Sequence, residues 1–379
     1  MIIRNAMIHD AIHPEPYKGD ILIRDGKLVS VGGHAEGDGD VLDASGLRTY
    51  PGFVDAHSHI GLDGYGGPTG NTYDYNEMND ICCPQLRGYD SYYPLDAAIP
   101  MALAGGVTTV AAGPGSANVL GGTFFAVKLY GTTVEEAMLR ESIGMKCAFG
   151  ENPKRCYRDK CDSARMTTAA KLREMLYEAR DYMMRKEAAG DDFSKCPKFD
   201  MKMEALIPVL KGELPLKAHA HRSDDIMTAL RIAREFDVRI TIEHCTEGHL
   251  IVDALKAANV PVAVGPTLTN ASKLELLNKS WTTPGILAAA GLQVSIITDA
   301  PVIPQQYLPL CAGLAVKAGM DPFQALQAIT INPAKHIGVA DRVGSLEAGK
   351  DADIVLSDGD PLVSDTVIRR VIADGKILI

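Results

Sequence analysis

The chain has 379 residues, of which 46% are hydrophobic and 23% are charged. This length and composition are typical of a globular protein with a large core, and they exclude a disordered chain. The formal net charge is −10, and the sequence has none of the basic stripes that mark nucleic-acid binding. No apolar stretch approaches the ~20 residues that span a bilayer, and the first residues do not have the pattern of a secretory signal. We therefore expect a cytoplasmic protein that acts on a small molecule, not on nucleic acid or a membrane.

Short strand-like runs separated by tight turns occupy both ends of the chain. Residues 1–50 contain the hairpin signal Asp25-Gly26, and residues 343–379 contain the equivalent signal Asp374-Gly375. Neither end has enough strands to form a stable sheet alone. The sequence therefore predicts that 1–50 and 343–379 pair into one small β-sandwich module, and that 51–342 form the main domain.

Apolar strand-like runs alternate with helix-like patterns throughout the main domain. The runs lie near residues 53–59, 107–111, 124–130, 145–150, 215–220, 239–244, 260–265 and 294–299. This alternation indicates an α/β fold with a parallel sheet and right-handed crossovers. Eight repeats over this length favour a (β/α)8 TIM-type barrel, since such barrels typically need ~250 residues. An open, doubly wound sheet is the rival arrangement.

Residues 151–214 interrupt the regular alternation after the fourth run. They begin with a basic loop that contains Arg155 and Arg158 and continue with a helical pattern over 168–189. Segments that follow barrel strands lie on the face where active sites form. The insertion is therefore either a lid over the site or a surface elaboration.

The strongest chemical signal is the segment Pro51-Gly-Phe-Val-Asp-Ala-His57-Ser-His59. Residues two apart in a strand point to the same side, so His57 and His59 can share one metal ion. Neutral imidazole is a good ligand for zinc. Other candidate ligands end later runs, namely His219 in the fifth, His244 in the sixth and Asp299 in the eighth. Since the carboxyl ends of barrel strands converge on one face, the sequence predicts a metal site there.

These motifs together resemble the amidohydrolase superfamily, and most of all its imidazolonepropionase-like and prolidase-like members. The segment 344–355, Gly-Ser-Leu-Glu-Ala-Gly-Lys-Asp-Ala-Asp-Ile-Val, and the segment 332–335, Asn-Pro-Ala-Lys, also fit that group. The resemblance covers essentially the whole chain. It implies one or two divalent ions, with zinc expected and manganese, iron or nickel as alternatives. It also implies a homo-oligomer.

The resemblance implies a role for each of the candidate ligands. His57 and His59 would bind the more buried ion together with Asp299, and His219 and His244 would bind a second ion. Asp299 would also act as the general base, while the metal activates hydroxide. The implied reaction is hydrolysis of a carbon–nitrogen bond in an amide, a peptide or a cyclic amide.

Family members with two metal ions need a bridging ligand, which is often a carboxylated lysine from the fourth strand. Glu151 lies at the end of the fourth run, whereas Lys146 lies early in it. Because a glutamate replaces the lysine in some members, we expect Glu151 to be the bridge. Otherwise Glu151 caps the strand or binds substrate, and the site holds a single ion.

The deaminases of the superfamily resemble one another in a glutamate three residues after the histidine of the fifth strand. Here Arg222 follows His219 at that spacing, and Asp224 follows His221. The resemblance therefore favours amide hydrolysis over the alternative, a zinc-dependent deaminase of an aminated heterocycle. A non-catalytic metal-binding protein on the same fold would lack Asp299 or a ligand in the first run.

Several further residues are candidates for contact with substrate. His221 faces the same way as His219, so it could act in catalysis, bind substrate or replace His219 as a ligand. Arg222, Arg155 and Arg158 could clamp a substrate carboxylate, although each could equally be a solvated surface charge. We expect the glycine-rich loops at 64–67 and 113–116 to form walls of the active site.

Overall fold

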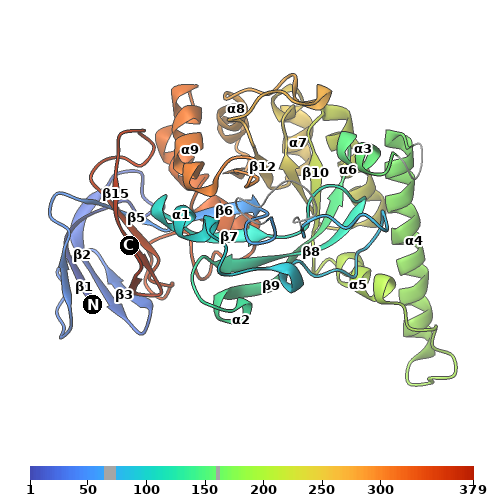
Figure 1. The fold of residues 1–379 in the computed structure, drawn as a ribbon, viewed down its shortest axis with the longest axis horizontal. Coiled ribbons are helices and arrows are strands. Elements are labelled where there is room, and N and C mark those ends of the chain that lie inside the picture. Colours follow the sequence, from blue (N-terminus) through green and yellow to red (C-terminus); the bar gives the residue numbers. More distant parts are fainter. Residues whose placement is uncertain (64–73, 159–162) are drawn as a thin grey trace.

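The computed structural model describes residues 1–63, 74–158 and 163–379. Figure 1 shows the strands of both chain ends together at one side of the molecule, where both termini also lie. The larger part of the chain, with most of the helices, lies beside them. Among the described residues, no helix is both long and apolar enough to cross a membrane.

Within these residues, eight strands form the sheet of the main domain, in the order β13-β12-β11-β10-β9-β8-β7-β6. The strands are β6 (Phe53–Ser58), β7 (Val107–Ala112), β8 (Leu120–Lys128), β9 (Met138–Ala148), β10 (Leu216–Ala220), β11 (Ile240–His244), β12 (Val262–Val264) and β13 (Val294–Ile296). The two outer strands meet, because the Asp299 amide donates to the His57 carbonyl at 3.2 Å and the His59 amide donates to the Ala300 carbonyl at 2.8 Å. The sheet is therefore barrel-like, as predicted, and not open.

The direction of β8 differs from the prediction of a wholly parallel barrel. β8 pairs antiparallel with both β7 and β9. A parallel connection needs a crossover of ~12 residues or more, whereas only residues 113–119 join β7 to β8. The short link therefore forces the chain to turn back, and it keeps the loop 113–119 on the face where β7 ends.

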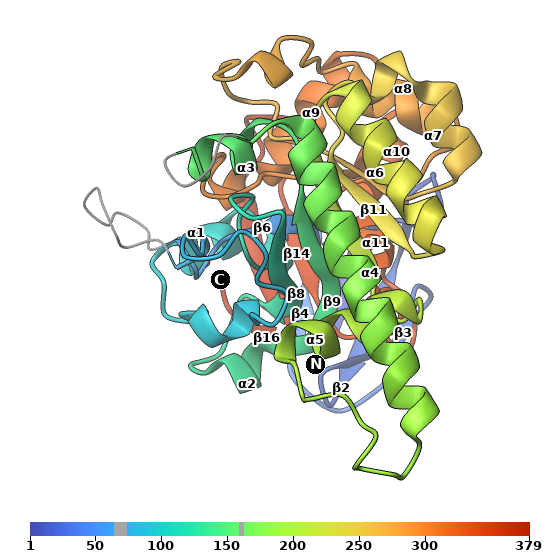
Figure 2. The same cartoon turned by 90° about the vertical axis from the view of Figure 1, so that its right-hand side faces the viewer.

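The helices form an outer layer around the barrel strands (Figure 2). They are α1 (Ala98–Ala104), α2 (Val134–Ala137), α3 (Glu151–Cys156), α4 (Arg165–Ala189), α5 (Met201–Leu210), α6 (Ser223–Phe236), α7 (Val252–Ala258), α8 (Thr283–Ala289), α9 (Leu308–Lys317), α10 (Pro322–Gln327) and α11 (Ile331–His336), with 3₁₀ turns η1 (Gly88–Ser91), η2 (Gly248–Leu250), η3 (Leu274–Leu276) and η4 (Gln305–Tyr307). The long α4 packs against α5 and α6 on the outside of the barrel. The long helix of the insertion thus belongs to the outer layer and does not form a lid.

α11 and the residues after it close the end of the barrel that lies opposite the carboxyl ends of the strands. Ala334 and Ile337 pack against Val54, Ala56 and Phe124 in one buried cluster. This plug makes the interior a packed core rather than a channel, as small barrels require.

A buried carboxylate links β6 to the end of the barrel sheet. Asp55 accepts hydrogen bonds from the Thr298 hydroxyl at 2.6 Å, the Thr298 amide at 3.0 Å and the Gln305 side chain at 2.6 Å. It also accepts one from the His57 amide at 3.0 Å. Burial raises the pKa of Asp55 to about 6. The carboxylate fixes the ends of β6 and β13 relative to each other.

The strands of the two chain ends share a second sheet. They are β1 (Ile2–Ile8), β2 (Tyr17–Arg24), β3 (Lys27–Val31), β4 (Val41–Asp43), β5 (Arg48–Pro51), β14 (Ile354–Ser357), β15 (Ile368–Ala373) and β16 (Lys376–Ile377). Within the described residues they form one hydrogen-bonded path, β16-β15-β14-β5-β1-β2-β3, with β4 on β1. The structure therefore does not confirm the two stacked sheets of the predicted sandwich.

A buried lysine joins the barrel to this second sheet. The Lys128 ammonium, at the end of β8, lies 2.8 Å from Asp351, 2.9 Å from Asp353 and also in contact with Asp374. Although burial alone raises the pKa of Asp351, its hydrogen bonds to Arg342, Lys128 and Lys27 lower it to about 2. One cation thus contacts carboxylates from three points of the C-terminal segment.

We expect Lys128→Met to lower the free energy of unfolding by about 3–5 kcal/mol, because removal of one partner leaves buried charges without compensation. Guanidinium titration followed by circular dichroism measures this change. Lys27→Met is the matched control, since Lys27 also pairs with Asp351 but its side chain is 46% exposed, and exposed pairs contribute about 0–1 kcal/mol. Equal effects of the two substitutions would contradict a structural role for Lys128.

Candidate metal centre

The predicted ligands meet at the carboxyl ends of the barrel strands. His57 lies near the end of β6 and His59 directly follows the strand, His219 lies in β10, and His244 is the last residue of β11. Asp299 follows β13, and its Oδ1 lies 3.3 Å from His59 Nε2 and 3.6 Å from His57 Nε2. The potential ligand atoms of two groups lie within 4.8 Å of one another, His57 with His244 and Asp299, and His219 with His221 and His244.

Each site histidine is held through its Nδ1 atom. His57 Nδ1 donates to the Glu243 carboxylate at 2.9 Å, His59 Nδ1 to the Gly113 carbonyl at 2.7 Å and His244 Nδ1 to the Gly265 carbonyl at 2.8 Å. His219 Nδ1 lies 2.9 Å from the Ser116 hydroxyl, and His221 Nδ1 lies 2.8 Å from the Thr246 hydroxyl. The carboxylate and the two carbonyls can only accept, so they fix the tautomer in which Nε2 of His57, His59 and His244 carries the lone pair, and the two hydroxyls orient the rings of His219 and His221.

The free atoms of these rings fit a bound cation. Among the described residues, the buried Nε2 atoms of His219 and His244 have no hydrogen-bond partner, which is rare for buried polar atoms. Burial lowers the pKa of His244 to about 4 and holds the pKa values of His57, His219 and His221 well below the usual range. Neutral imidazoles with a carboxylate are a donor set that suits divalent metal ions.

A second buried carboxylate, Glu243, orients the His57 ring by accepting a hydrogen bond from its Nδ1. Besides His57 Nδ1, it lies 2.8 Å from the Lys217 ammonium and 2.8 Å from His336 Nε2, and it accepts a hydrogen bond from Thr241 at 2.7 Å. Burial alone raises the pKa of Glu243, but Lys217 and His336 hold it well below its usual range. The charged carboxylate therefore has every oxygen engaged, as a buried charge requires.

Lys146 lies inside this centre. Its Nζ is 3.1 Å from His57 Nε2, and the residue is fully buried. Burial lowers the pKa of Lys146 to about 8. The Nζ atoms of Lys146 and Lys217 each lie 5.3 Å from the centroid of the Phe124 ring, so both ammonium groups contact this apolar side chain.

The backbone is strained where two ligands enter the site. His244 has a φ of 72° and Asp299 has a φ of 53°. Residues other than glycine rarely adopt this left-handed region, and such strain is concentrated at functional sites. At both positions the chain leaves a strand, and the unusual turn directs the side chain into the mouth of the barrel.

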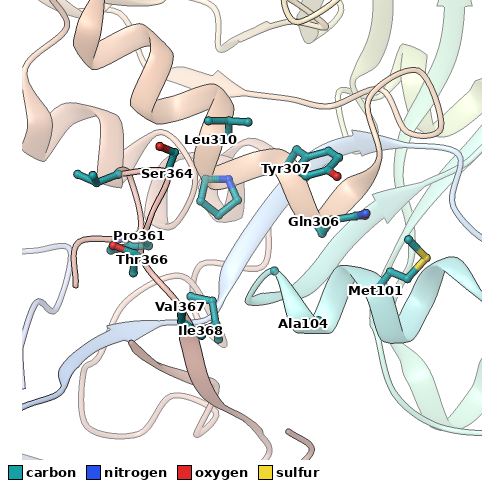
Figure 3. A pocket seen from close by; sticks show the side chains of 13 residues that line it. Met101, Ala104, Gln306, Tyr307, Leu310, Pro361, Ser364, Thr366, Val367 and Ile368 are labelled. Atoms are coloured by element: carbon teal, nitrogen blue, oxygen red, sulfur yellow. The ribbon is translucent and has the colours of Figure 1, made fainter. Parts of the chain in front are cut away.

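A cavity of about 270 Å³ opens onto the metal centre, and its lining includes His59, His219, His221 and Asp299. This volume suits a small substrate. Figure 3 shows a different hollow, of about 560 Å³, between α1, α9 and the segment 361–368. Because that hollow contains none of the site histidines, we assign the chemistry to the smaller cavity.

The amidohydrolase family model matches residues 49–378. The chain belongs to the amidohydrolase family. Shorter stretches, 22% and 24% of the chain, also match imidazolonepropionases. The resemblance predicted from the motifs around His57 and His59 is therefore confirmed, and with it the membership of a superfamily of metal-dependent hydrolases.

Similar proteins agree with this family. An amidohydrolase structure from Thermotoga maritima MSB8 has a TM-score of 0.96 and 41% identity, over 100% of this chain and 99% of that one. The amidohydrolase tasK of Hapsidospora irregularis is 29% identical over 94% of this chain, which spans 39% of its length. The 5-methylthioadenosine/S-adenosylhomocysteine deaminase of Desulforudis audaxviator is 24% identical over 94% of this chain and 84% of that protein.

Some predicted site residues of this amidohydrolase lie elsewhere. Glu151 is on the first turn of α3, where its carboxylate and amide face Glu275, and neither ligand group of the described residues includes it. Glu151 was expected to bridge the ions because it ends the fourth run, but β9 ends at Ala148 and the chain then turns into α3. The structure does not place its carboxylate among the histidines.

The three arginines expected to bind substrate lie in different places. Arg155 lines the cavity. Arg222 is instead paired with the half-exposed Asp224 at 2.7 Å, and Arg158 is exposed on the surface. Of the two expected wall loops, 113–116 lies at the site through Gly113 and Ser116, whereas 64–67 lies outside the described residues, as do 159–162 of the insertion.

The sequence interpretation set Lys146 aside because it lies early in the fourth run, and it missed three further residues at the site, namely Glu243, Lys273 and Glu275. Glu243 directly precedes His244, and Lys146 lies in the fourth run. The alternation of side chains along a strand could therefore have identified both residues as candidates. Lys273 lines the cavity, and the buried Glu275 lies 3.9 Å from His221 Nε2. Both come from the loop after β12, where no periodicity marks them.

We expect Glu243→Gln to weaken metal binding about 10–100-fold, because the amide cannot accept from His57 and His336 as the carboxylate does. Chelator competition on apo-protein that is reloaded with zinc measures the affinity. Glu247→Gln is the control, since Glu247 is also a buried carboxylate but bonds to Ser223 and Asn278 instead of a ligand. An unchanged affinity in folded Glu243→Gln protein would refute the support of His57 by Glu243.

Proposed function

We propose that this amidohydrolase hydrolyses a carbon–nitrogen bond of a small amide, peptide or cyclic amide, with one or two divalent ions. The observation that carries the proposal is the shared orientation of the site imidazoles, each held at Nδ1 by a separate partner and gathered around Asp299. A purely structural cluster would have no reason to leave buried Nε2 atoms without partners.

The residues divide into two sets of ligands. His57 and His59 with Asp299 would hold one ion, and His219 and His244 would hold a second. A divalent ion held by these residues would polarise a substrate carbonyl and lower the pKa of water toward neutrality. Zinc suits these nitrogen and carboxylate donors, and manganese, iron or nickel are alternatives.

Asp299 is our candidate for the general base. Its carboxylate lies at the centre of the site, within 3.6 Å of two imidazoles, and it also lines the substrate cavity. From this position the carboxylate can take a proton from the attacking water and pass it to the leaving nitrogen. A base within reach of both partners is what general acid–base catalysis needs.

We propose Lys146 in place of Glu151 as the bridging residue. The Lys146 amine lies on the fourth barrel strand, 3.1 Å from His57 Nε2 and within the site. The amine can add carbon dioxide and release a proton, which gives a carbamate anion with two oxygen donors. The chain then provides a bridging carboxylate where the sequence interpretation had expected a glutamate.

Deamination is the alternative reaction, and a deaminase is among the relatives that cover most of this chain. The carboxylate expected to relay protons in that reaction is Asp224, but Asp224 faces Arg222 at the surface. Amide hydrolysis needs no such carboxylate besides Asp299. Arg155 and Lys273, which line the cavity, are our candidates for binding a carboxylate of the substrate.

We expect the zinc-loaded protein to cleave members of a panel of amides, dipeptides and lactams, and Asp299→Asn to lower kcat by about 10²–10⁴-fold, as loss of a general base does. The measurements are release of amine and carboxylate, together with ammonia from aminated heterocycles. Asp321→Asn is the control, since Asp321 is the N-cap of α10 and does not line the cavity. Ammonia from the heterocycles without cleavage of any larger amide would establish deamination instead.

We expect Lys146→Met to lose the second ion, whereas Glu151→Gln keeps both. Metal content per chain, measured after reconstitution of apo-protein with and without bicarbonate, reports this difference. Only the wild type and Glu151→Gln should gain metal from bicarbonate. The bridging assignment returns to Glu151 if its substitution, and not that of Lys146, removes an ion.

A further inference from the structure

Strand β10 repeats the histidine spacing of β6. His219 and His221 are two residues apart, as are His57 and His59. Side chains at this spacing leave a strand on the same side, and the structure places both His219 and His221 in the lining of the cavity. The ring centroids of His219 and His221 are 4.6 Å apart, which is close to the 5.4 Å between those of His57 and His59.

His221 also shares the environment of the expected ligands. Its Nδ1 lies 2.8 Å from the Thr246 hydroxyl, just as the Nδ1 of His219 lies 2.9 Å from the Ser116 hydroxyl. The side chain is 4% exposed, and its ring stacks on that of His244 at 4.7 Å. His219, His221 and His244 offer ligand atoms within 4.8 Å of one another.

The nearest carboxylate does not occupy the free atom of His221. Glu275 lies 3.9 Å from His221 Nε2, which is too long for a hydrogen bond. Its oxygens bond instead to the Lys273 ammonium at 3.2 Å and to the Glu151 amide at 2.9 Å. The Nε2 atom of His221 therefore remains available to a cation.

We propose that the second ion is held by three histidines, His219, His221 and His244, with His221 as an additional ligand. The inference rests on the proposed function, which supplies the metal centre. His221 is then a ligand and not a proton carrier, because Thr246 engages Nδ1 and the ion engages Nε2. This revises the catalytic role that the sequence suggested for His221.

Three neutral imidazole nitrogens as ligands favour some metal ions over others at the second position. Imidazole suits zinc, copper, iron and nickel, whereas magnesium, calcium and manganese prefer oxygen ligands. The second position should therefore reject magnesium and manganese more strongly than the first position does, since Asp299 supplies an oxygen there.

The test uses the intact apo-protein titrated with cobalt(II), whose visible absorption reports the ligands, and chelator competition gives an affinity for each ion. We expect His221→Gln to keep the first ion at wild-type affinity and to bind the second at least tenfold more weakly. The visible spectrum of the second ion should change as one nitrogen is lost. His249→Gln is the control for loss of a histidine, since His249 bonds to Thr283 and does not line the cavity.

Thr246→Val and Ser116→Ala form a second pair that does not alter any ligand. Each removes the hydroxyl that holds one Nδ1, and loss of such a partner weakens metal binding about 10–100-fold. If His221 is a ligand, both substitutions weaken the second ion. If His221 serves only the substrate, Ser116→Ala alone does so. This pair decides the question even if His221→Gln does not fold.

The outcomes separate the inference from the proposed function. If His221→Gln and Thr246→Val bind the second ion with an affinity within about twofold of the wild type, the three-histidine site is overturned. A wild type that binds a single ion also overturns it. A wild type that binds no ion under any loading condition overturns the metal-dependent function itself. Selective weakening of the second ion in both variants supports the site.

Discussion

The hydrogen bond at each Nδ1 atom is the constraint on which the candidate metal centre depends. An imidazole that donates from Nδ1 presents its lone pair at Nε2, and its ring cannot rotate without breaking that bond. The partners come from different strands and loops, namely Glu243, Gly113, Ser116, Thr246 and Gly265. The site is therefore assembled only when the whole barrel is closed, because no single segment orients its own ligands.

The reversal of β8 contributes to this assembly. A β-strand that ran parallel to β7 would need a long crossover along the outside of the barrel. The short loop 113–119 instead stays at the mouth, where Gly113 holds His59 and Ser116 holds His219. Strand β8 supplies no ligand among the described residues, but its Phe124 lies under Lys146 and Lys217. The departure from a wholly parallel barrel thus positions two ligands of the centre.

The two proposed ion positions differ in their electrostatic support. The first is backed by the charged network of Glu243, Lys217 and His336 behind His57, and it includes the carboxylate of Asp299. The second is backed by the hydroxyls of Ser116 and Thr246, which carry no charge. A ligand that donates to a carboxylate becomes more basic than one that donates to a hydroxyl. The positions should therefore hold their ions with different strength and reactivity.

The sequence by itself determined the eight barrel strands, the family and the main candidate ligands, since apolar runs and the His57-x-His59 spacing are local properties of a strand. The direction of β8 was not within reach, because the predicted runs 107–111 and 124–130 left a link long enough for a crossover, whereas β8 in the structure begins at Leu120. Only the tertiary structure decided that Lys146 and not Glu151 reaches His57, and that Glu243 supports that ring. Counting residues along a run gives the side of a strand on which a residue lies. It does not give the point at which the strand ends and α3 begins, or which side chains from distant strands meet inside the barrel, because barrel closure alone sets these.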